Sequence, residues 1–204
     1  MFIIGITGGT GAGKTSLVNV LKSFGALLLD CDAIYHELLL NNTDMIKEIE
    51  TRFDGVFTDG RIDRRKLGEA VWNDPASLCD LNTITHKYIG KEMERRINSF
   101  KAKGGNLAAI DAIALIESGQ SERCDVVVGV TAPREKRLSR IIDRDGLTKE
   151  QALMRINAQQ PEKFYKDNCD HILENAYDTQ SVFEDKCKEF IQNLLKNQKS
   201  YIAN

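Results

Sequence analysis

A glycine-rich segment close to the start of the chain has the spacing of a phosphate-binding loop. Residues 8–16 read GGTGAGKTS and match G-x-x-x-x-G-K-[ST] through Gly8, Gly13, Lys14 and Thr15. The apolar run FIIGIT precedes this segment and a helical pattern over residues 16–24 follows it, which is the strand–loop–helix context that the pattern requires. The sequence therefore predicts a loop that binds a nucleoside triphosphate such as ATP.

The residue types in this loop fit the chemistry of a bound polyphosphate. Glycine permits the backbone conformations that point successive N–H groups inward, and the following helix N-terminus adds a partial positive charge. Lys14 supplies a full charge for the β- and γ-phosphates, and the Thr15 hydroxyl is a candidate Mg²⁺ ligand. The predicted nucleotide-binding residues of the loop are Gly8, Gly11, Ala12, Gly13, Lys14, Thr15 and Ser16.

Carboxylates follow two of the predicted strands. The segment LLLDCDAIYHEL places Asp30 and Asp32 after the second strand, at the edge of a parallel sheet where ligands bind. Either aspartate could cap the helix over residues 33–40, or accept a proton from an attacking hydroxyl, or help to hold Mg²⁺. Two carboxylates beside a phosphate loop favour a functional role, with Asp32 as the candidate base. Asp111, which ends the third strand, could contact Mg²⁺ through water or cap the strand end.

Three arginines follow the fourth predicted strand. Arg137, Arg140 and Arg144 are three and four residues apart and share one helix face. Because acidic residues lie between them, this could be an ordinary solvated face. Their position after the phosphate loop and before a turn-linked helix pair favours a lid instead. An arginine over the transferred phosphoryl group can contribute about 10³–10⁵ in rate.

Composition excludes several classes of protein. The chain has 204 residues, 42% of them apolar, with a net charge of −2, and a nucleic-acid-coating protein would usually be basic. Five scattered cysteines form neither a disulfide framework nor a zinc motif. No apolar run approaches the roughly 20 residues of a membrane helix, and the N-terminus lacks a leader pattern. We expect a cytoplasmic monomer that binds neither nucleic acid nor membrane.

The order of apolar segments predicts an α/β fold. Strand-like runs over residues 2–6, 26–29, 107–110, 126–131 and 171–173 alternate with helical segments, which is typical of a parallel sheet covered on both faces. The gap between the second and third runs far exceeds the dozen or so residues that a crossover needs. Most of this gap has helical character, at residues 45–53, 64–72 and 78–100, and predicts an inserted lobe.

Local signals place the remaining helices. Pro75, Pro133 and Pro161 fit the first position of a helix, and Thr148 with Gln151 has the spacing of a capping box. Residues 138–166 predict paired short helices around a turn at Gly146. The tail over residues 181–195 is amphipathic, with a predicted core face of Val182, Phe183, Cys187, Phe190, Ile191 and Leu194.

The inserted lobe contains a basic segment, GRIDRRKLGEAVW. Of its basic residues, Arg64 is the candidate contact to an anionic second substrate. His86 lies further along, in ITHKYI, and a lone histidine in a helical lobe more often has a structural role.

Taken together, these segments resemble the dephospho-CoA kinase family, over all but the last twenty or so residues. The matching segments are GITGGTGAGKTS, the DCD of LLLDCDAI, DGRIDRRKLGEAVW, the His of ITHKYI, DAIALIESG and VTAPREKRLSRIIDRDGLTKEQALMRINAQQ. The loop is common to many families, whereas the D-x-D, I-D-R-R and lid segments are more specific.

The resemblance implies ATP-dependent phosphorylation of the 3′-hydroxyl of dephospho-CoA, the last step of CoA synthesis, with Mg²⁺. It implies a P-loop kinase fold with a five-stranded parallel sheet, helices on both faces, an inserted helical substrate lobe and a lid. It assigns the base role to Asp32 and a transition-state contact to Arg140, beside Lys14. It also implies substrate contacts by Arg64 and His86, and an adenine pocket that includes Asn175.

On this interpretation residues 1–204 form one kinase domain. The core comprises residues 1–31, 105–136 and 167–204, the lobe about 32–104 and the lid about 137–166. Three departures from the family pattern affect the lobe and the adenine pocket. Lys87 and Ile113 replace usual prolines, and Glu174-Asn175-Ala176 replaces an Asn-Asn-Gly-like turn.

Three other functions are compatible with parts of the sequence. A shikimate or nucleoside-monophosphate kinase would share the loop, although the large insertion and the I-D-R-R segment favour a diphosphate-bearing acceptor. A regulatory ATPase would turn over without an acceptor, and a GTPase would need an N-K-x-D motif that the sequence lacks. A non-catalytic nucleotide-binding module would leave the aspartates and arginines without a role.

Overall fold

The computed structural model describes residues 1–72 and 74–202, with side chains up to residue 198. The chain divides into two compact units, the first formed by residues 1–28 and 105–204 and the second by residues 29–104. The functional division into core, lobe and lid stays a prediction, because residues 137–166 cluster with the rest of the first unit.

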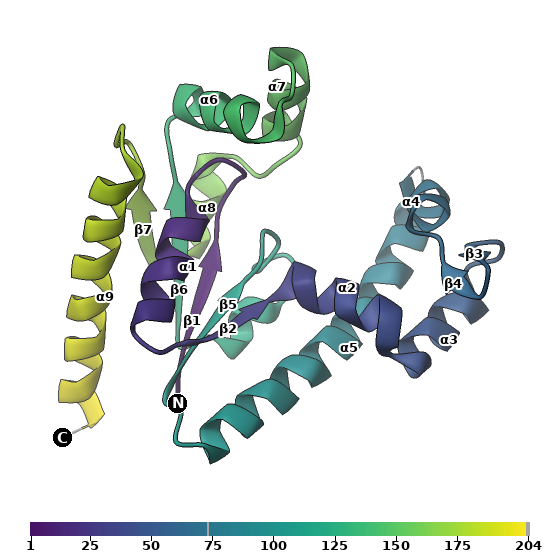
Figure 1. Ribbon diagram of the computed structural model, residues 1–204, viewed down its shortest axis with the longest axis horizontal. Coiled ribbons are helices and arrows are strands. Elements are labelled where there is room, and N and C mark those ends of the chain that lie inside the picture. The colour runs from purple at the N-terminus through teal and green to yellow at the C-terminus, as the bar shows by residue number, and fades with distance from the viewer. Residues whose placement is uncertain (73, 203–204) are drawn as a thin grey trace. The chain divides into compact units, whose positions relative to one another are not determined.

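A five-stranded sheet with the order β2-β5-β1-β6-β7 organises the fold (Figure 1). The β1–β5, β1–β6 and β6–β7 pairs are parallel, and Ile4 of β1 lies opposite Ala109 on one side and Val126 on the other. Since β1 lies in the centre, the loop that follows it emerges where the strand order reverses, which is where α/β sheets bind ligands. The strands are β1 (Phe2–Thr7), β2 (Leu27–Asp30), β5 (Leu107–Asp111), β6 (Val126–Thr131) and β7 (His171–Glu174).

Helices of the first unit connect and cover these strands. Helix α1 begins inside the glycine-rich loop, and α6 and α7 form a pair joined at Gly146, whose φ of 64° is left-handed. The helices are α1 (Lys14–Ser23), η1 (Gln120–Arg123), α6 (Arg134–Asp145), α7 (Lys149–Asn157), α8 (Glu162–Asn168) and α9 (Gln180–Ile202). Among the described residues, no helix combines the length and apolar character that a membrane crossing would require.

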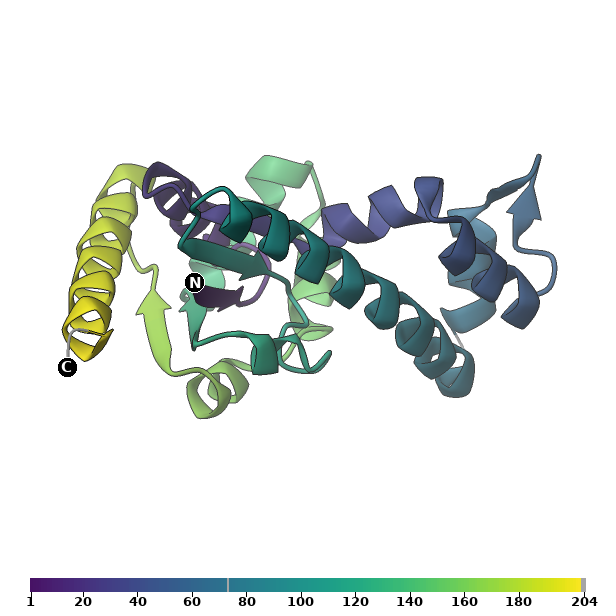
Figure 2. The ribbon, with the colours of Figure 1, turned by 90° about the horizontal axis from the view of Figure 1, so that it is seen from below.

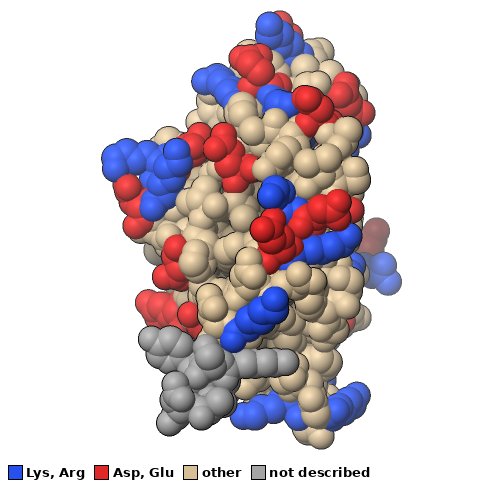
Figure 3. Space-filling view, turned by 90° about the vertical axis from the view of Figure 1, so that its left-hand side faces the viewer, with Lys and Arg blue, Asp and Glu red and all other residues tan. Residues whose placement is uncertain are grey.

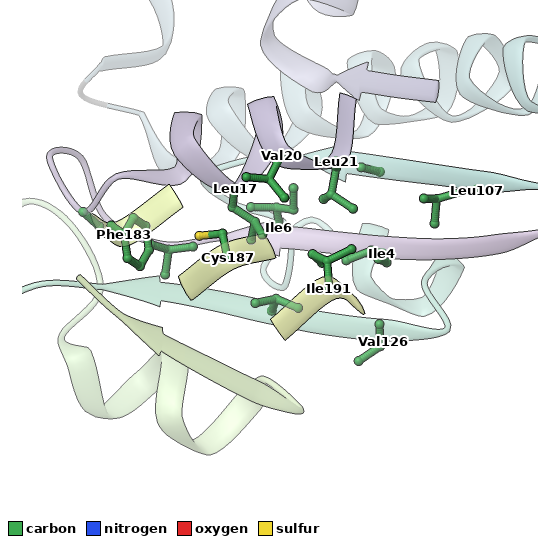
Figure 4. Packing of buried hydrophobic residues seen from close by; sticks show 14 of the residues in the cluster. Ile4, Ile6, Leu17, Val20, Leu21, Leu107, Val126, Phe183, Cys187 and Ile191 are labelled. Carbon is green, nitrogen blue, oxygen red and sulfur yellow. The ribbon is translucent and has the colours of Figure 1, made fainter. Parts of the chain in front are cut away.

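The main core of this unit lies between the sheet and two helices that pack side by side, α1 and α9 (Figure 4). Leu17 and Leu21 of α1 lie over β1, which contributes Ile4 to the same cluster, while Phe183 and Ile191 of α9 fill the neighbouring space. All five side chains are at most 1% exposed. Each fully buried side chain of this kind contributes roughly 1.5–3 kcal/mol, so this core fixes the start of α1 against the sheet and with it the glycine-rich loop.

The opposite face of the sheet is covered as well. Val128 and Val130 point into the main core, so Gly129 between them faces the other side. A Cβ atom at Gly129 would lie 2.9 Å from the sulfur of Cys169, which ends α8, and α8 packs on β6 and β7. The predicted α/β fold with helices on both faces of a parallel sheet is therefore confirmed.

The second unit is helical and carries one small hairpin. Its longest helix, α5, packs against α2, α3 and α4 through residues that include Leu81, Ile84 and Met93 (Figure 2). The Asn42 side chain caps α3 and the Asp74 side chain caps α5. The elements are α2 (Cys31–Asn41), α3 (Thr43–Arg52), β3 (Phe57–Thr58), β4 (Arg61–Ile62), α4 (Arg64–Trp72) and α5 (Pro75–Ala102).

Some local predictions are confirmed and others are wrong. The capping box of Thr148 and Gln151 is present, and Pro75 lies in the first turn of α5. Pro133 and Pro161 instead occupy the N-cap positions of α6 and α8, one residue earlier than predicted. Val182, predicted to face the core, is 46% exposed, because it lies one residue, or about 100° around the helix, away from the buried Phe183.

The surface around α9 carries no single-sign charge field. On the described part of this face, basic and acidic side chains are interspersed among uncharged ones (Figure 3). Several are paired locally along the helix, for example Lys186 with Glu189 and Lys188 with Asp185. This face therefore lacks the basic stripe that nucleic-acid-binding domains present.

Candidate active site

The glycine-rich loop lines a cavity of about 660 Å³ in the first unit. The cavity combines the loop with the ends of β5 and β7 and one face of α6. Its lining residues are Gly9, Thr10, Gly11, Gly13, Lys14, Thr15, Ser16, Asp111, Ile113, Arg140, Asp143, Arg144, Asn175, Asp178 and Gln180. Lys14 and Arg140 thus line one cavity together with Asn175, which the family resemblance alone assigned to an adenine pocket.

The conformation of the loop depends on its glycines and on Asn175. Gly11 and Gly13 have φ values of 78° and 106°, a region that residues with a Cβ rarely adopt. A Cβ atom at Gly13 would lie 2.3 Å from Nδ2 of Asn175. That amide is 5% exposed and donates a hydrogen bond of 3.0 Å to the Ala12 carbonyl. Asn175 therefore stabilises the loop through a buried hydrogen bond to its backbone. Its place in an adenine pocket stays a prediction.

Positive charge gathers at the start of α1. The Lys14 ammonium donates to the Gly8 carbonyl at 2.7 Å, across the loop. Helix α1 has no acidic residue in its first turn and no side-chain cap. A helix N-terminus of this kind favours an anion beside the ammonium group. This arrangement can bind a phosphate chain.

Arg140 connects α6 to the glycine-rich loop and to the segment that follows β7. Its guanidinium donates to the carbonyls of Gly11 and Tyr177 at 3.2 and 3.1 Å, and to the carbonyl and Oδ1 of Asn175 at 3.3 and 3.1 Å. Burial lowers the pKa of Arg140, yet an arginine remains charged at neutral pH. All its acceptors are uncharged, so Arg140 has its full charge available for an anionic ligand.

A hydrogen-bond cluster that the sequence did not predict joins the loop to the residues after α7. Oε1 of Gln159 accepts from the Thr10 N–H at 2.9 Å and from Arg137 at 2.6 Å, and its Nε2 donates to the Thr10 hydroxyl at 2.6 Å. Arg137 also donates to the Thr10 carbonyl at 2.9 Å. Both the oxygen and the nitrogen of the Gln159 amide therefore form hydrogen bonds. The only sequence signal was its place in the INAQQ segment, which assigned it no role.

The predicted lid arginines differ in their surroundings. Arg137 and Arg140 both contact the loop, and burial lowers the pKa of each. Arg144 also lines the cavity, but it is 60% exposed and pairs with Asp145, its neighbour in the chain. Of the three arginines predicted to share a helix face, Arg137 and Arg140 are therefore partly buried and bind the loop, whereas Arg144 is exposed.

The cavity offers oxygen ligands that suit Mg²⁺. The exposed Thr15 hydroxyl and the carboxylate of Asp111 both line it. Among the described residues there is no cluster of three or more metal-binding side chains. Mg²⁺ usually keeps several waters and is held by one or two protein oxygens plus substrate phosphates, so these residues fit an ion that enters with a nucleotide.

The candidate acceptor-side residues belong to the second unit. The Asp30 carboxylate accepts the Ala33 N–H at 2.9 Å and caps α2. This observation assigns the capping role to Asp30, whereas Asp32 is exposed in the first turn of α2. Arg64 is exposed and lies 3.4 Å from Nε2 of His36. His86 is half-buried on α5, and burial lowers its pKa.

Comparisons with known proteins agree with the geometry of the loop and the topology of the sheet. A family model described as dephospho-CoA kinase matches residues 2–181. A dephospho-CoA kinase from Dehalococcoides mccartyi is 39% identical over 78% of this chain and 81% of its own length, and one from Thermobifida fusca is 35% identical over 86% and 88%. A crystal structure of a Thermus thermophilus protein superposes with a TM-score of 0.80 at 28% identity, covering 96% of this chain and 97% of the other. The chain therefore belongs to the dephospho-CoA kinase family.

Proposed function

We propose that this protein transfers the γ-phosphate of ATP to the 3′-hydroxyl of dephospho-CoA, producing CoA and ADP in the last step of CoA synthesis. The observation that carries the proposal is a cavity lined by the glycine-rich loop with its Lys14, by Arg140 and by Asn175. This cavity lies in a chain of the dephospho-CoA kinase family.

On the nucleotide side, the loop and Lys14 bind the phosphates. The Lys14 ammonium exchanges the Gly8 carbonyl for phosphate oxygens, which is favourable because charge-assisted hydrogen bonds are roughly twice as strong as neutral ones. Arg140 is positioned by four uncharged acceptors and stabilises the charge that spreads over the transferred group. Asn175 bounds the adenine pocket.

On the acceptor side, Asp32 accepts the proton of the attacking 3′-hydroxyl. The capping of α2 by Asp30 supports this role, because it leaves the exposed carboxylate of Asp32 outside the cap. Arg64 contacts the diphosphate of the acceptor. His86 contacts the acceptor on the family resemblance alone, and its half-buried position on α5 equally suits a structural role.

The proposal includes Mg²⁺, a cytoplasmic location and a monomeric enzyme. Thr15, with Asp111 nearby, would hold the ion, and bound Mg²⁺ would neutralise phosphate charge. Five free cysteines fit a reducing compartment. One chain supplies every residue to which the proposal gives a role, so it needs no second subunit.

The test is ATP turnover measured with and without dephospho-CoA. We expect ADP release that depends on dephospho-CoA and on Mg²⁺. NMR of the product should show the new phosphate at the 3′ position. Turnover with shikimate or a nucleoside monophosphate in place of dephospho-CoA would contradict the proposal, as would ATP hydrolysis that ignores every acceptor. A Lys14→Ala variant controls for contaminating kinases.

A further inference from the structure

A second cavity lies wholly within the helical unit. Its volume of about 450 Å³ falls in the roughly 300–1,000 Å³ range of small-molecule sites. The end of α2, α3, the β3–β4 hairpin and the start of α4 form its walls. The lining residues are His36, Leu39, Leu40, Asn41, Ile46, Gly60, Arg61, Ile62 and Arg64.

Two arginines, Arg61 and Arg64, are among the residues that line this cavity. In the part of the chain that the structure describes, neither Arg61 nor Arg64 forms an ion pair, and no acidic residue lines the cavity. The adjacent Asp63 accepts the N–H groups of Arg65 and Lys66 at the start of α4, and these bonds lower its pKa. Because Asp63 is used in this way, the two arginines can bind an external anion.

Apolar side chains also line the cavity, and one of them is open to solvent. Leu39, Ile46 and Ile62 form its wall, and Leu40 at its rim is 70% exposed. A ligand that covers Leu40 would remove apolar surface from water, at roughly 25 cal/mol per Å². Asn41 adds a polar group, since its Nδ2 donates to the Glu37 carbonyl and leaves Oδ1 to accept a hydrogen bond.

The order of residues along α2 matches the order of chemical groups in the acceptor. Asp32, His36 and Leu40 are four residues apart and share a helix face. At 1.5 Å per residue, His36 lies about 6 Å and Leu40 about 12 Å along the helix from Asp32. Dephospho-CoA presents a ribose hydroxyl, then a 5′-diphosphate, then an amide-containing arm with two methyl groups.

We propose that this cavity binds the pantetheine arm of the acceptor, with the diphosphate between Arg61 and Arg64. This inference rests on the proposed function. The gem-dimethyl group contacts Leu40 and Ile62, and an arm amide donates to Oδ1 of Asn41. The cavity thereby distinguishes dephospho-CoA from nucleotides that lack the arm.

The experiment compares Leu40→Gln with Leu78→Gln in the full chain. Both leucines are exposed, and Leu78 lies on α5 outside the cavity. We expect Leu40→Gln to raise the KM of dephospho-CoA about fivefold to tenfold, with kcat and the KM of ATP unchanged, and Leu78→Gln to match the wild type. Pantetheine 4′-phosphate should compete with dephospho-CoA but not with ATP, and should inhibit Leu40→Gln more weakly.

The results separate two failures. If the wild-type protein shows no turnover that depends on dephospho-CoA, the proposed function fails. If turnover is normal but Leu40→Gln and Leu78→Gln have equal KM values, or pantetheine 4′-phosphate does not inhibit, only the arm site is overturned. A third result would assign the cavity to the nucleoside instead. In that case AMP would inhibit and pantetheine 4′-phosphate would not, and the inhibition by AMP would be weaker in Leu40→Gln.

Discussion

The two cavities described above differ in whether their basic side chains already have protein partners. In the nucleotide cavity, Lys14 and Arg140 donate to protein carbonyl and amide oxygens. In the lobe cavity, Arg61 and Arg64 are exposed and have no ion-pair partner among the described residues. The first site is organised before its ligand arrives, whereas the second leaves its charges to be matched by the acceptor.

This difference indicates where binding energy arises at each site. In the nucleotide cavity a phosphate replaces neutral acceptors of partly buried cations, an exchange that favours the charged acceptor. In the lobe, ion pairs formed by exposed arginines contribute only about 0.2–1 kcal/mol each. The apolar wall around Leu40 must therefore provide much of the affinity for the acceptor. Substitutions in the first cavity should affect kcat most, and those in the second KM.

Replacing Arg140 should produce the largest effect. We expect Arg140→Ala to lower kcat about 10³-fold or more, because a cation at the transferred group is lost. Its hydrogen bonds to Gly11 and Asn175 are lost as well, so the melting temperature should also fall. Arg134→Ala, an exposed arginine on the same helix, is the matched control. A change confined to the KM of ATP would make Arg140 a ground-state ligand.

Asp32→Asn should have the next largest effect. A positioned base contributes roughly 10²–10⁴-fold, so kcat should fall by that factor while the KM of ATP stays near its wild-type value. Asp30→Asn is the control, because asparagine caps a helix as well as aspartate does and the Ala33 N–H keeps its acceptor. A loss below tenfold in Asp32→Asn, or equal losses in the two variants, would remove Asp32 from the base role.

The sequence predicted the features that depend on local chemistry. The glycine-rich loop, the five strands and the capping box of Thr148 each follow from short-range patterns, and the structure contains all of them. The position of Arg140 after the fourth strand also predicted an arginine near the phosphates, whereas Asn175 was expected only from the family resemblance; both residues line the cavity. These features need only backbone geometry and the topology of a parallel sheet.

Other features were beyond prediction because they depend on contacts between distant residues. Gln159 bonds to Thr10 across 149 positions, and no local pattern marks a glutamine for that role. The β3–β4 hairpin has strands of two residues each, too short for an alternating pattern. The choice between Asp30 and Asp32 as the cap required the observed start of α2 at Cys31.

Arg64→Ala tests whether Arg64 of the lobe cavity binds the acceptor. We expect the KM of dephospho-CoA to rise about twofold to fivefold, since an ion pair formed by an exposed arginine contributes about 0.2–1 kcal/mol, with little change in kcat. Arg65→Ala is the control, because Arg65 is 76% exposed and pairs with Glu69. Steady-state kinetics with dephospho-CoA as the varied substrate decide the matter, and equal KM values for the two variants would contradict the assignment of Arg64.

Gln159→Leu tests whether the nucleotide cavity is organised in advance. The change leaves the Thr10 N–H without its acceptor and removes one of the two hydrogen bonds of Arg137, so the free energy of unfolding should fall by about 1–3 kcal/mol. A loosened loop should also lower kcat/KM for ATP severalfold. Gln160→Leu changes the neighbouring glutamine and should leave both quantities near wild type. If both variants behave alike, the cluster around Thr10 does not organise the loop.

The smallest expected effect concerns His86, and it tests whether this residue belongs to the acceptor site or to the interior of the lobe. Burial lowers the pKa of His86 below the ordinary value of about 6.5 for histidine. Between the folded and unfolded pKa values the unfolded chain therefore binds more protons, so stability present above about pH 6.5 is lost as the pH falls. His86→Gln should reduce this loss, so that urea unfolding between pH 7.5 and 5.5 gives a flatter pH dependence than the wild type. A higher KM for dephospho-CoA in His86→Gln, with an unchanged pH dependence of stability, would instead place His86 among the acceptor contacts.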